Sequence, residues 1–379
     1  MPHTLSKLLL LALLLTAPIS AITENTTINT ALTIYEQPRF YTLKQDSLQL
    51  PNNTDLFLPA WENRLYALAT FSYTAAEKWR FHTQARPTIT TTTLATNITL
   101  HIDESYIEIP YENAFVFIGR KNIRDGVAFS TNPTDFFGEN KTVDTSKRAE
   151  DRRQERLGDN VLGAELLLDN STYSLILSPE TLSSTPRYYA KAAYQLNDLN
   201  TDLSLHFFGT PVTDFTPSGI GLNISTTLGD ALVLYSETAN RWDSFGNNAL
   251  NTVIGGHLTF PDSTNLIIEY NHNGSGYTPA QWNLIRTTPG ILPVGHLRQD
   301  YAFIRYSHPN VGPTLQAALV YLQNLNDGSA VFNPYLEAHP TDTLTLLLST
   351  YIFISSESTE FAKIPWTPEI TFTAKWFWI

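Results

Sequence analysis

Residues 187–196 read RYYAKAAYQL, and this stretch shows most clearly the pattern that decides the fold. Successive side chains of an extended strand point to opposite faces. One face therefore carries Tyr188, Ala190, Ala192, Tyr194 and Leu196, and the other carries Arg187, Tyr189, Lys191, Ala193 and Gln195. The sequence thus predicts a strand here with one apolar face and one polar face.

The same alternation recurs along the chain, in segments of about ten residues, a length typical of strands in membrane barrels. We expect eighteen strands, near 28–39, 62–73, 77–87, 98–109, 113–123, 160–169, 171–178, 187–197, 199–208, 217–228, 230–239, 251–260, 264–273, 298–308, 313–323, 328–339, 342–354 and 368–379. Alternation alone also suits a soluble β-sandwich, whose sheets each face water on one side.

The lengths of the connections separate these two folds. Connections after even-numbered strands are tight, whereas most of those after odd-numbered strands are long: 40–61, 124–159, 240–250, 274–297 and 355–367. Short periplasmic turns alternating with long extracellular loops are typical of outer-membrane barrels. The sequence therefore predicts an all-β, transmembrane, antiparallel up-and-down β-barrel of about 16 to 18 strands, a size that leaves an aqueous lumen.

Composition agrees with this fold class. Of 379 residues, 16% are charged, against roughly 25% in ordinary soluble domains, and 42% are hydrophobic. A helical membrane protein is excluded because it needs apolar runs of about 18 residues or more. The net charge of -12 argues against a nucleic-acid partner, and the absence of cysteine excludes disulfides and thiolate metal sites.

Residues 1–21 read as a secretory signal peptide. Lys7 supplies a positive charge, an apolar run follows at residues 8–15, and Ser20 and Ala21 end a small-residue cleavage site. We expect residues 22–379 to form a single barrel domain, because no linker or repeat interrupts them.

Two motifs carry a family resemblance. Residues 115–158 read FVFIGRKNIRDGVAFSTNPTDFFGENKTVDTSKRAEDRRQERLG, and residues 266–277 read LIIEYNHNGSGY. Both stretches resemble a broad, largely uncharacterised group of porin-like outer-membrane barrels of Gram-negative bacteria. The resemblance implies a barrel in the outer membrane through which something passes. Two departures stand out: Asp125 replaces a usual Trp, and Ile379 replaces a usual terminal Phe or Trp.

Charged side chains on the polar faces are candidates for the lining of the lumen. They are Lys78, Arg80, Arg86, Glu165, Arg187, Lys191, Glu237, Glu269 and Arg305. Rings of one sign would indicate clear ion selectivity. The mixed signs indicate either weak selectivity or ion pairs that neutralise one another.

The 124–159 connection is too long for a turn and too charged to lie in lipid. Long loops of compact proteins are usually functional or disordered. We interpret it as a constriction or plug folded into the lumen, with Pro133 and Phe136–Phe137 anchoring it to the wall; a solvated extracellular loop is the alternative. Its candidate residues are Arg124, Asp125, Asn132, Pro133, Asp135, Arg152, Arg153 and Arg156.

Enzymatic motifs are lacking: the sequence contains no nucleophile elbow, zinc-protease motif or phosphate-binding loop. Adjacent carboxylates such as Asp103 and Glu104 are expected on opposite faces of a strand, which suits acid–base catalysis poorly. We therefore expect no enzyme, no cofactor and no metal. The predicted function is passive passage or export of small solutes; the alternative is a plugged, non-conducting barrel serving as a receptor, adhesin or structural protein.

The final strand carries an expected assembly signal. Ile370, Phe372, Ala374, Trp376 and Trp378 share its apolar face, whereas Lys375 lies on the mixed face. By the resemblance, outer-membrane assembly reads a terminal aromatic on the apolar face. We expect Trp378, with Trp376 beside it, to take that role. The expected partners of the protein are therefore the outer-membrane assembly machinery, the lipid around the barrel and an unknown small solute.

Overall fold

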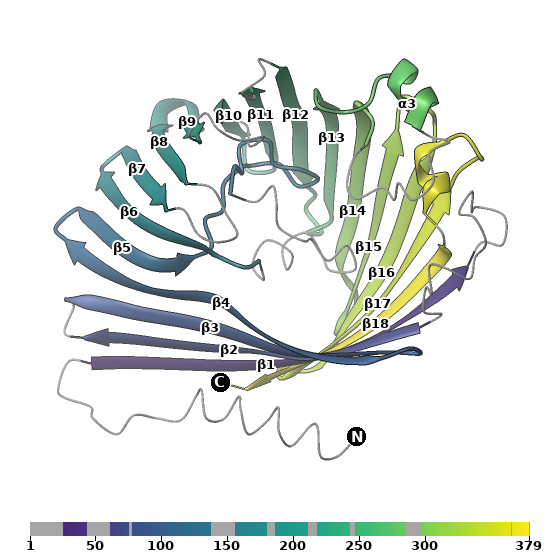
Figure 1. Ribbon diagram of the computed structural model, residues 1–379, viewed down its shortest axis with the longest axis horizontal. Coiled ribbons are helices and arrows are strands. Elements are labelled where there is room, and N and C mark those ends of the chain that lie inside the picture. Colours follow the sequence, from purple (N-terminus) through teal and green to yellow (C-terminus); the bar gives the residue numbers. More distant parts are fainter. Residues whose placement is uncertain are drawn as a thin grey trace.

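The barrel is closed by pairing of its first and last strands. The computed structural model describes residues 26–43, 61–75, 78–137, 156–179, 186–210, 218–242, 247–285, 297–364 and 366–378. Eighteen antiparallel strands in these residues form one sheet in which each strand pairs with its neighbours in sequence and β1 pairs with β18 (Figure 1). Closure is the way a spanning sheet pairs its backbone groups in lipid, which offers no hydrogen bonds.

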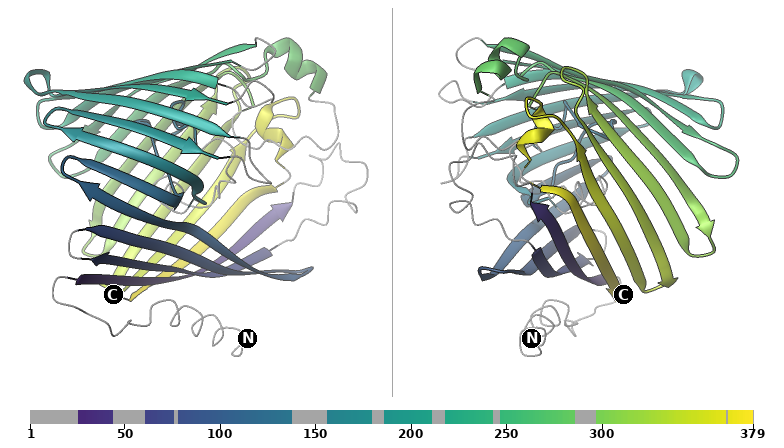
Figure 2. Two further views of the ribbon diagram at one scale, coloured as in Figure 1. Left: turned by 60° about the vertical axis from the view of Figure 1, so that its left-hand side comes forward. Right: turned by 90° about the vertical axis from the view of Figure 1, so that its right-hand side faces the viewer.

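The strands have these bounds: β1 Thr26–Leu43, β2 Trp61–Ala75, β3 Trp79–Thr92, β4 Thr96–Tyr111, β5 Ala114–Lys121, β6 Asp159–Leu168, β7 Ser171–Ser178, β8 Arg187–Leu196, β9 Thr201–Gly209, β10 Ser218–Leu228, β11 Leu232–Trp242, β12 Asn248–Thr259, β13 Asn265–Asn273, β14 Asp300–Gly312, β15 Leu315–Asn324, β16 Ala330–Thr341, β17 Leu344–Ile354 and β18 Trp366–Trp378. Short turns lie at one end of the barrel, and α3 (Pro279–Ile285) and η2 (Glu360–Lys363) lie at the other (Figure 2). Among the described residues, no helix is long and apolar enough to cross a membrane.

The eighteen expected strands are all present, with differences at their ends. The bounds of the expected connection 240–250 are wrong, because β11 continues to Trp242 and β12 begins at Asn248. Similarly, β3 and β4 extend to Thr92 and Thr96. Cross-strand pairing extends β3 and β4 mainly through Thr and Asn residues, whose two faces look alike in the sequence. It extends β11 through Asn240, Arg241 and Trp242, which pair with the first residues of β12. The expected signal peptide at 1–21 lies outside the described residues.

The two faces of the wall follow the alternation. On β8, Tyr188 and Tyr194 are 51% and 48% exposed, whereas Tyr189 between them is 1% exposed. On β18, Ile370, Phe372 and Trp378 are exposed and Lys375 is buried, with its amine 5.2 Å from the ring centre of Tyr35. The apolar face is thus the outer one, as predicted, and the polar face lines the interior.

Candidate functional site: a segment folded into the barrel

The chain leaves the wall after β5 and enters the barrel. Residues 122–137, here called the inner segment, lie inside the ring of strands (Figure 1). Residues 156–158 lead back to β6, where the Gly158 N–H donates to the Asp103 carbonyl oxygen at 2.7 Å. The structure thus places the described part of the 124–159 connection against the inner wall; Arg152 and Arg153 lie outside the described residues.

Glu237 of β11 holds the middle of the inner segment. Its carboxylate accepts hydrogen bonds from the backbone N–H groups of Val127, Ala128 and Thr134, at 2.8, 3.2 and 2.8 Å. The Thr134 hydroxyl and the Asn132 amide donate to it as well. Glu237 is fully buried, so these donors replace the water that a carboxylate requires. Glu237 is an anchor for the segment and not a free charge in the lumen.

Glu269 of β13 holds the adjoining residues in the same way. It accepts from the backbone N–H groups of Phe129 and Ser130 at 2.7 and 2.9 Å, and also from the Ser130 hydroxyl. The Tyr235 hydroxyl of β11 donates to it at 2.6 Å. Two wall carboxylates, on β11 and β13, therefore fix residues 127–134 by their main chain.

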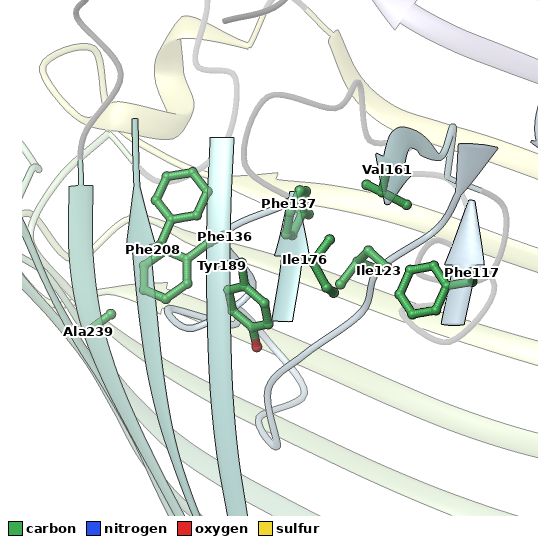
Figure 3. Close-up of a cluster of buried hydrophobic side chains, with 9 residues drawn as sticks. All are labelled: Phe117, Ile123, Phe136, Phe137, Val161, Ile176, Tyr189, Phe208 and Ala239. Carbon is green, nitrogen blue, oxygen red and sulfur yellow. The ribbon is translucent and has the colours of Figure 1, made fainter. Parts of the chain in front are cut away.

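An apolar cluster fastens the end of the segment (Figure 3). Phe136 stacks on Phe208 of β9, with ring centres 5.0 Å apart, and Phe137 meets Tyr189 of β8 edge-on at 5.7 Å. These rings are all buried, and such aromatic pairs are worth about 0.5–1.5 kcal/mol beyond their burial. The predicted anchoring by Phe136–Phe137 agrees with these contacts.

Ion pairs and a carbonyl contact surround this cluster. Arg156 pairs with Asp135 at 2.5 Å and donates to the Ile123 carbonyl oxygen at 3.0 Å. Arg241 of β11 donates to the Pro133 carbonyl oxygen at 2.5 Å. Both ends of the inner segment are thereby tied to each other and to the wall.

Asp125 begins a buried polar network. It pairs with Lys191 and accepts from the Tyr189 hydroxyl at 2.5 Å. Tyr189 also contacts Nδ1 of His206 at 2.7 Å, and His206 Nε2 contacts Asn223 at 3.1 Å. Asp125, which departs from the Trp usual in the family that the sequence resembles, therefore joins the segment to β8 by charge and not by ring packing.

Close approach of segment and wall requires two glycines. Gly126 has φ +100°, and an added Cβ there would lie 2.7 Å from a Glu237 carboxylate oxygen. At Gly221 of β10, an added Cβ would lie 2.6 Å from the Thr134 methyl carbon. Only glycine leaves the space that the segment occupies.

The other predicted lumen residues fall into three groups. Arg80, Arg86 and Arg187 pair with Glu108, Asp103 and Asp159, and Arg305 donates to the Tyr335 hydroxyl at 2.9 Å. Glu165 faces the lumen between Phe115 and Ser174 of the neighbouring strands. Lys78 lies in the exposed turn before β3, so its expected wall position is wrong.

Asp103 and Glu104 correct a second expectation. The pairing of β3 with β4 shifts between Gln84 and Ala85, which gives β4 one extra residue at this point. A bulge of this kind interrupts alternation. Asp103 accordingly binds Arg86, and Glu104 accepts from the Asn122 backbone N–H at 2.8 Å, so both carboxylates lie on the inner side.

Sequence reasoning missed several residues of the site, and for Arg241 and Tyr189 the reason can be identified. Arg241 lay beyond the expected end of its strand at residue 239, so it had no assigned face. Tyr189 lies on the predicted polar face, but an aromatic residue there does not by itself indicate a binding role.

Among the described residues, no group of three or more His, Cys, Asp or Glu could hold a metal ion.

Comparisons bear on the fold. No family model and no curated protein matches the sequence. Among solved structures, OccK11 (OpdR) of Pseudomonas aeruginosa matches with TM-score 0.60 and 11% identity over 93% of this chain and 96% of that chain. OccAB3 of Acinetobacter baumannii matches with TM-score 0.59 and 11% identity, over 93% and 99% of the two chains. OccD3 (OpdP) of Pseudomonas aeruginosa matches with TM-score 0.58 and 13% identity, over 96% and 93%.

These structural neighbours are outer-membrane porins. At 11–13% identity, the likeness concerns the fold. The chain therefore has the fold of an outer-membrane porin, a closed antiparallel barrel of 18 strands.

Proposed function

We propose that this protein is a channel in the outer membrane of a Gram-negative bacterium, through which small solutes pass passively. The observation that carries the proposal is the clamped inner segment inside an 18-stranded barrel. Barrels of 16 to 18 strands enclose an aqueous channel when nothing fills them. A segment bound along one side of such a lumen narrows the channel without needing to seal it.

The contacts support a fixed constriction. Wall groups of β4, β8, β9, β10, β11 and β13 hold the inner segment. The carboxylates among them bind main-chain N–H groups, whatever the side chains of the segment are. Most charges of the segment are neutralised: Asp125 by Lys191 and Asp135 by Arg156. Arg124 is exposed, and we assign it as the charge that a passing solute meets.

The decisive experiment is conductance in a planar lipid bilayer. We expect the full-length protein to form channels, and a variant with residues 127–134 replaced by a Gly-Ser linker to conduct several-fold more. If the native protein does not conduct and the linker variant does, the plugged barrel that acts as a receptor, adhesin or structural protein would be favoured. Absence of conductance in both proteins would contradict the channel.

We further propose that Trp378 is the assembly signal. It faces outward on the closing strand and lies opposite Leu32 of β1, while Trp376 lies opposite Ile34. Trp378→Ala is expected to reduce insertion far more than deletion of Ile379, because the deletion leaves the outer face of β18 intact. Heat-modifiable gel mobility measures insertion; the reverse order of effects would contradict the assignment.

A further inference from the structure

A recess lies in the inner wall between the inner segment and the short turns. Its volume is about 330 Å³, near the lower end of the range of about 300–1,000 Å³ that ligand pockets span. Lumen-facing side chains of β7 to β10 line it, together with Val127 of the segment: Thr172, Lys191, Gln195, Asp202, Ser204 and Asn223. The turn at Asp169 and Asn170, between β6 and β7, forms the edge of the recess at the short-turn end of the barrel.

Part of this lining is occupied by the protein itself. Lys191 pairs with Asp125. Ser204 and Asn223 contact Nε2 of His206 at 2.8 and 3.1 Å, and Asn223 also accepts from the Thr134 hydroxyl. The hydrogen-bond network that holds the inner segment thus forms the side of the recess next to that segment, and it fixes the shape of the recess.

The remaining polar groups are available to a ligand. Asp202 and Gln195 are partners across the β8–β9 pair, and both are exposed. Neither side chain makes a hydrogen bond or ion pair with any other residue in the described part of the chain. Because Asp125 cancels the charge of Lys191, the charge that the recess presents is the carboxylate of Asp202, with Asp169 at its edge.

We propose that this recess binds a small hydroxylated primary amine, such as an amino sugar. The ammonium group pairs with Asp202, since charge-assisted hydrogen bonds are stronger than neutral ones. Ring hydroxyls meet the Gln195 amide and the Thr172 hydroxyl, while Val127 covers one apolar edge. This inference rests on the proposed channel, in which the recess receives the solute on the periplasmic side of the constriction.

Equilibrium dialysis of the full-length protein in detergent tests the recess without requiring conduction. The probes are glucosamine at pH 6, where its amine is protonated, glucose as its neutral counterpart, and gluconate as an anion. We expect saturable binding of glucosamine, binding of glucose about tenfold weaker, and no measurable binding of gluconate.

Variants locate the binding. Asp202→Asn is expected to weaken glucosamine binding about tenfold and to abolish the preference over glucose, whereas Gln195→Ala weakens both sugars alike. Asp230→Asn is the matched control, because Asp230 is an exposed turn carboxylate outside the recess. Equal binding of glucosamine and glucose, or an unchanged affinity in Asp202→Asn, would overturn the proposal.

The two proposals fail separately. If the barrel conducts but does not prefer glucosamine to glucose, the channel proposal stands and the binding site in the recess is contradicted. If the barrel binds glucosamine at Asp202 but does not conduct, the binding site stands and the channel is contradicted.

Discussion

Two stretches of the inner wall use the same kinds of residues in different ways. On β11 and β13, Glu237 and Glu269 are 0% and 1% exposed, and their acceptors are filled by main-chain donors of the inner segment. On β2 to β4, the charges mainly pair with one another: Arg80 with Glu108, and Arg86 with Asp103. The Arg80 side chain there remains 45% exposed.

This difference shows that the alternation of polar and apolar residues predicts which charged side chains point into the barrel, but not which groups they bind. Where the inner segment covers the wall, carboxylates become structural, because burial without donors costs several kcal/mol. Where other charged strands lie beside them, the same residue types form ion pairs whose arginine side chain remains partly exposed. Four predictions test this contrast, from the largest expected effect to the smallest.

Glu237→Ala is expected to have the largest effect. It leaves the buried N–H groups of Val127, Ala128 and Thr134 without acceptors, at about 1–3 kcal/mol for each unsatisfied group. We expect the free energy of unfolding in detergent to fall by at least about 3 kcal/mol and the single-channel current to rise and become noisy. Glu165→Gln, on the inner wall, is the control; equal behaviour of the two variants would break the comparison.

Arg86→Ala should have an intermediate effect. Asp103 is fully buried and accepts two hydrogen bonds from Arg86, at 2.9 and 3.0 Å. Because the Arg86 side chain is itself partly exposed, we expect a loss of about 2 kcal/mol in the free energy of unfolding. Arg80→Ala should cost under about 1 kcal/mol, since Lys121 still lies 3.3 Å from Glu108. Urea titration compares the two; a larger cost for Arg80→Ala would refute this ranking.

Glu360 extends the comparison to a buried carboxylate at the end of the barrel that carries α3 and η2, here called the rim. It accepts from the Leu297 N–H, the Tyr301 hydroxyl and the Asn324 amide, at 2.8, 2.7 and 2.6 Å. Burial, with a smaller contribution from the nearby Asp327 carboxylate, raises the pKa of Glu360 to about 7. The folded rim therefore binds its proton more tightly than the unfolded chain, where a Glu has a pKa of about 4.3.

The sign of the pH dependence follows. Stability of the rim is greatest below about pH 4.3 and is lost as the pH rises towards 7. We expect proteolysis between residues 279 and 299 to accelerate from pH 5 to pH 8 relative to a Glu360→Gln variant measured at the same pH. Glu357→Gln, an exposed neighbour, is the control. A constant ratio between the native protein and Glu360→Gln would rule out this linkage.

Arg124→Glu is expected to leave the free energy of unfolding nearly unchanged, because Arg124 is exposed. Its effect should appear in the reversal potential under a salt gradient, which shifts towards cation preference when a constriction changes sign. Lys78→Glu, in the exposed turn before β3, should shift it less. An equal shift in both variants would place Arg124 away from the narrowest part of the lumen.

Much of the wall was predictable from the sequence. Strand number, the outer face of β8 and β18, and the short turns all follow from a period of two and from turn residues, both of which are local properties. The ends of β3, β4, β11 and β12 did not follow, because they depend on pairing with the neighbouring strand. In β3 and β4 the added residues are also mostly Thr and Asn, whose two faces look alike. The bulge at Asp103 was equally hidden, since it depends on the register with β3.

The sequence by itself determined that Glu237, Glu269 and Lys191 point inward and that residues 124–159 are too long and polar for a turn, because side-chain direction and composition are local. Only the tertiary structure decided what these groups meet. Residues 127–134 bind carboxylates more than 100 positions away in the chain, and Asp125 binds a lysine 66 positions away. Such partners depend on how the barrel closes and on the space that Gly126 and Gly221 leave inside it, and no local pattern encodes that space.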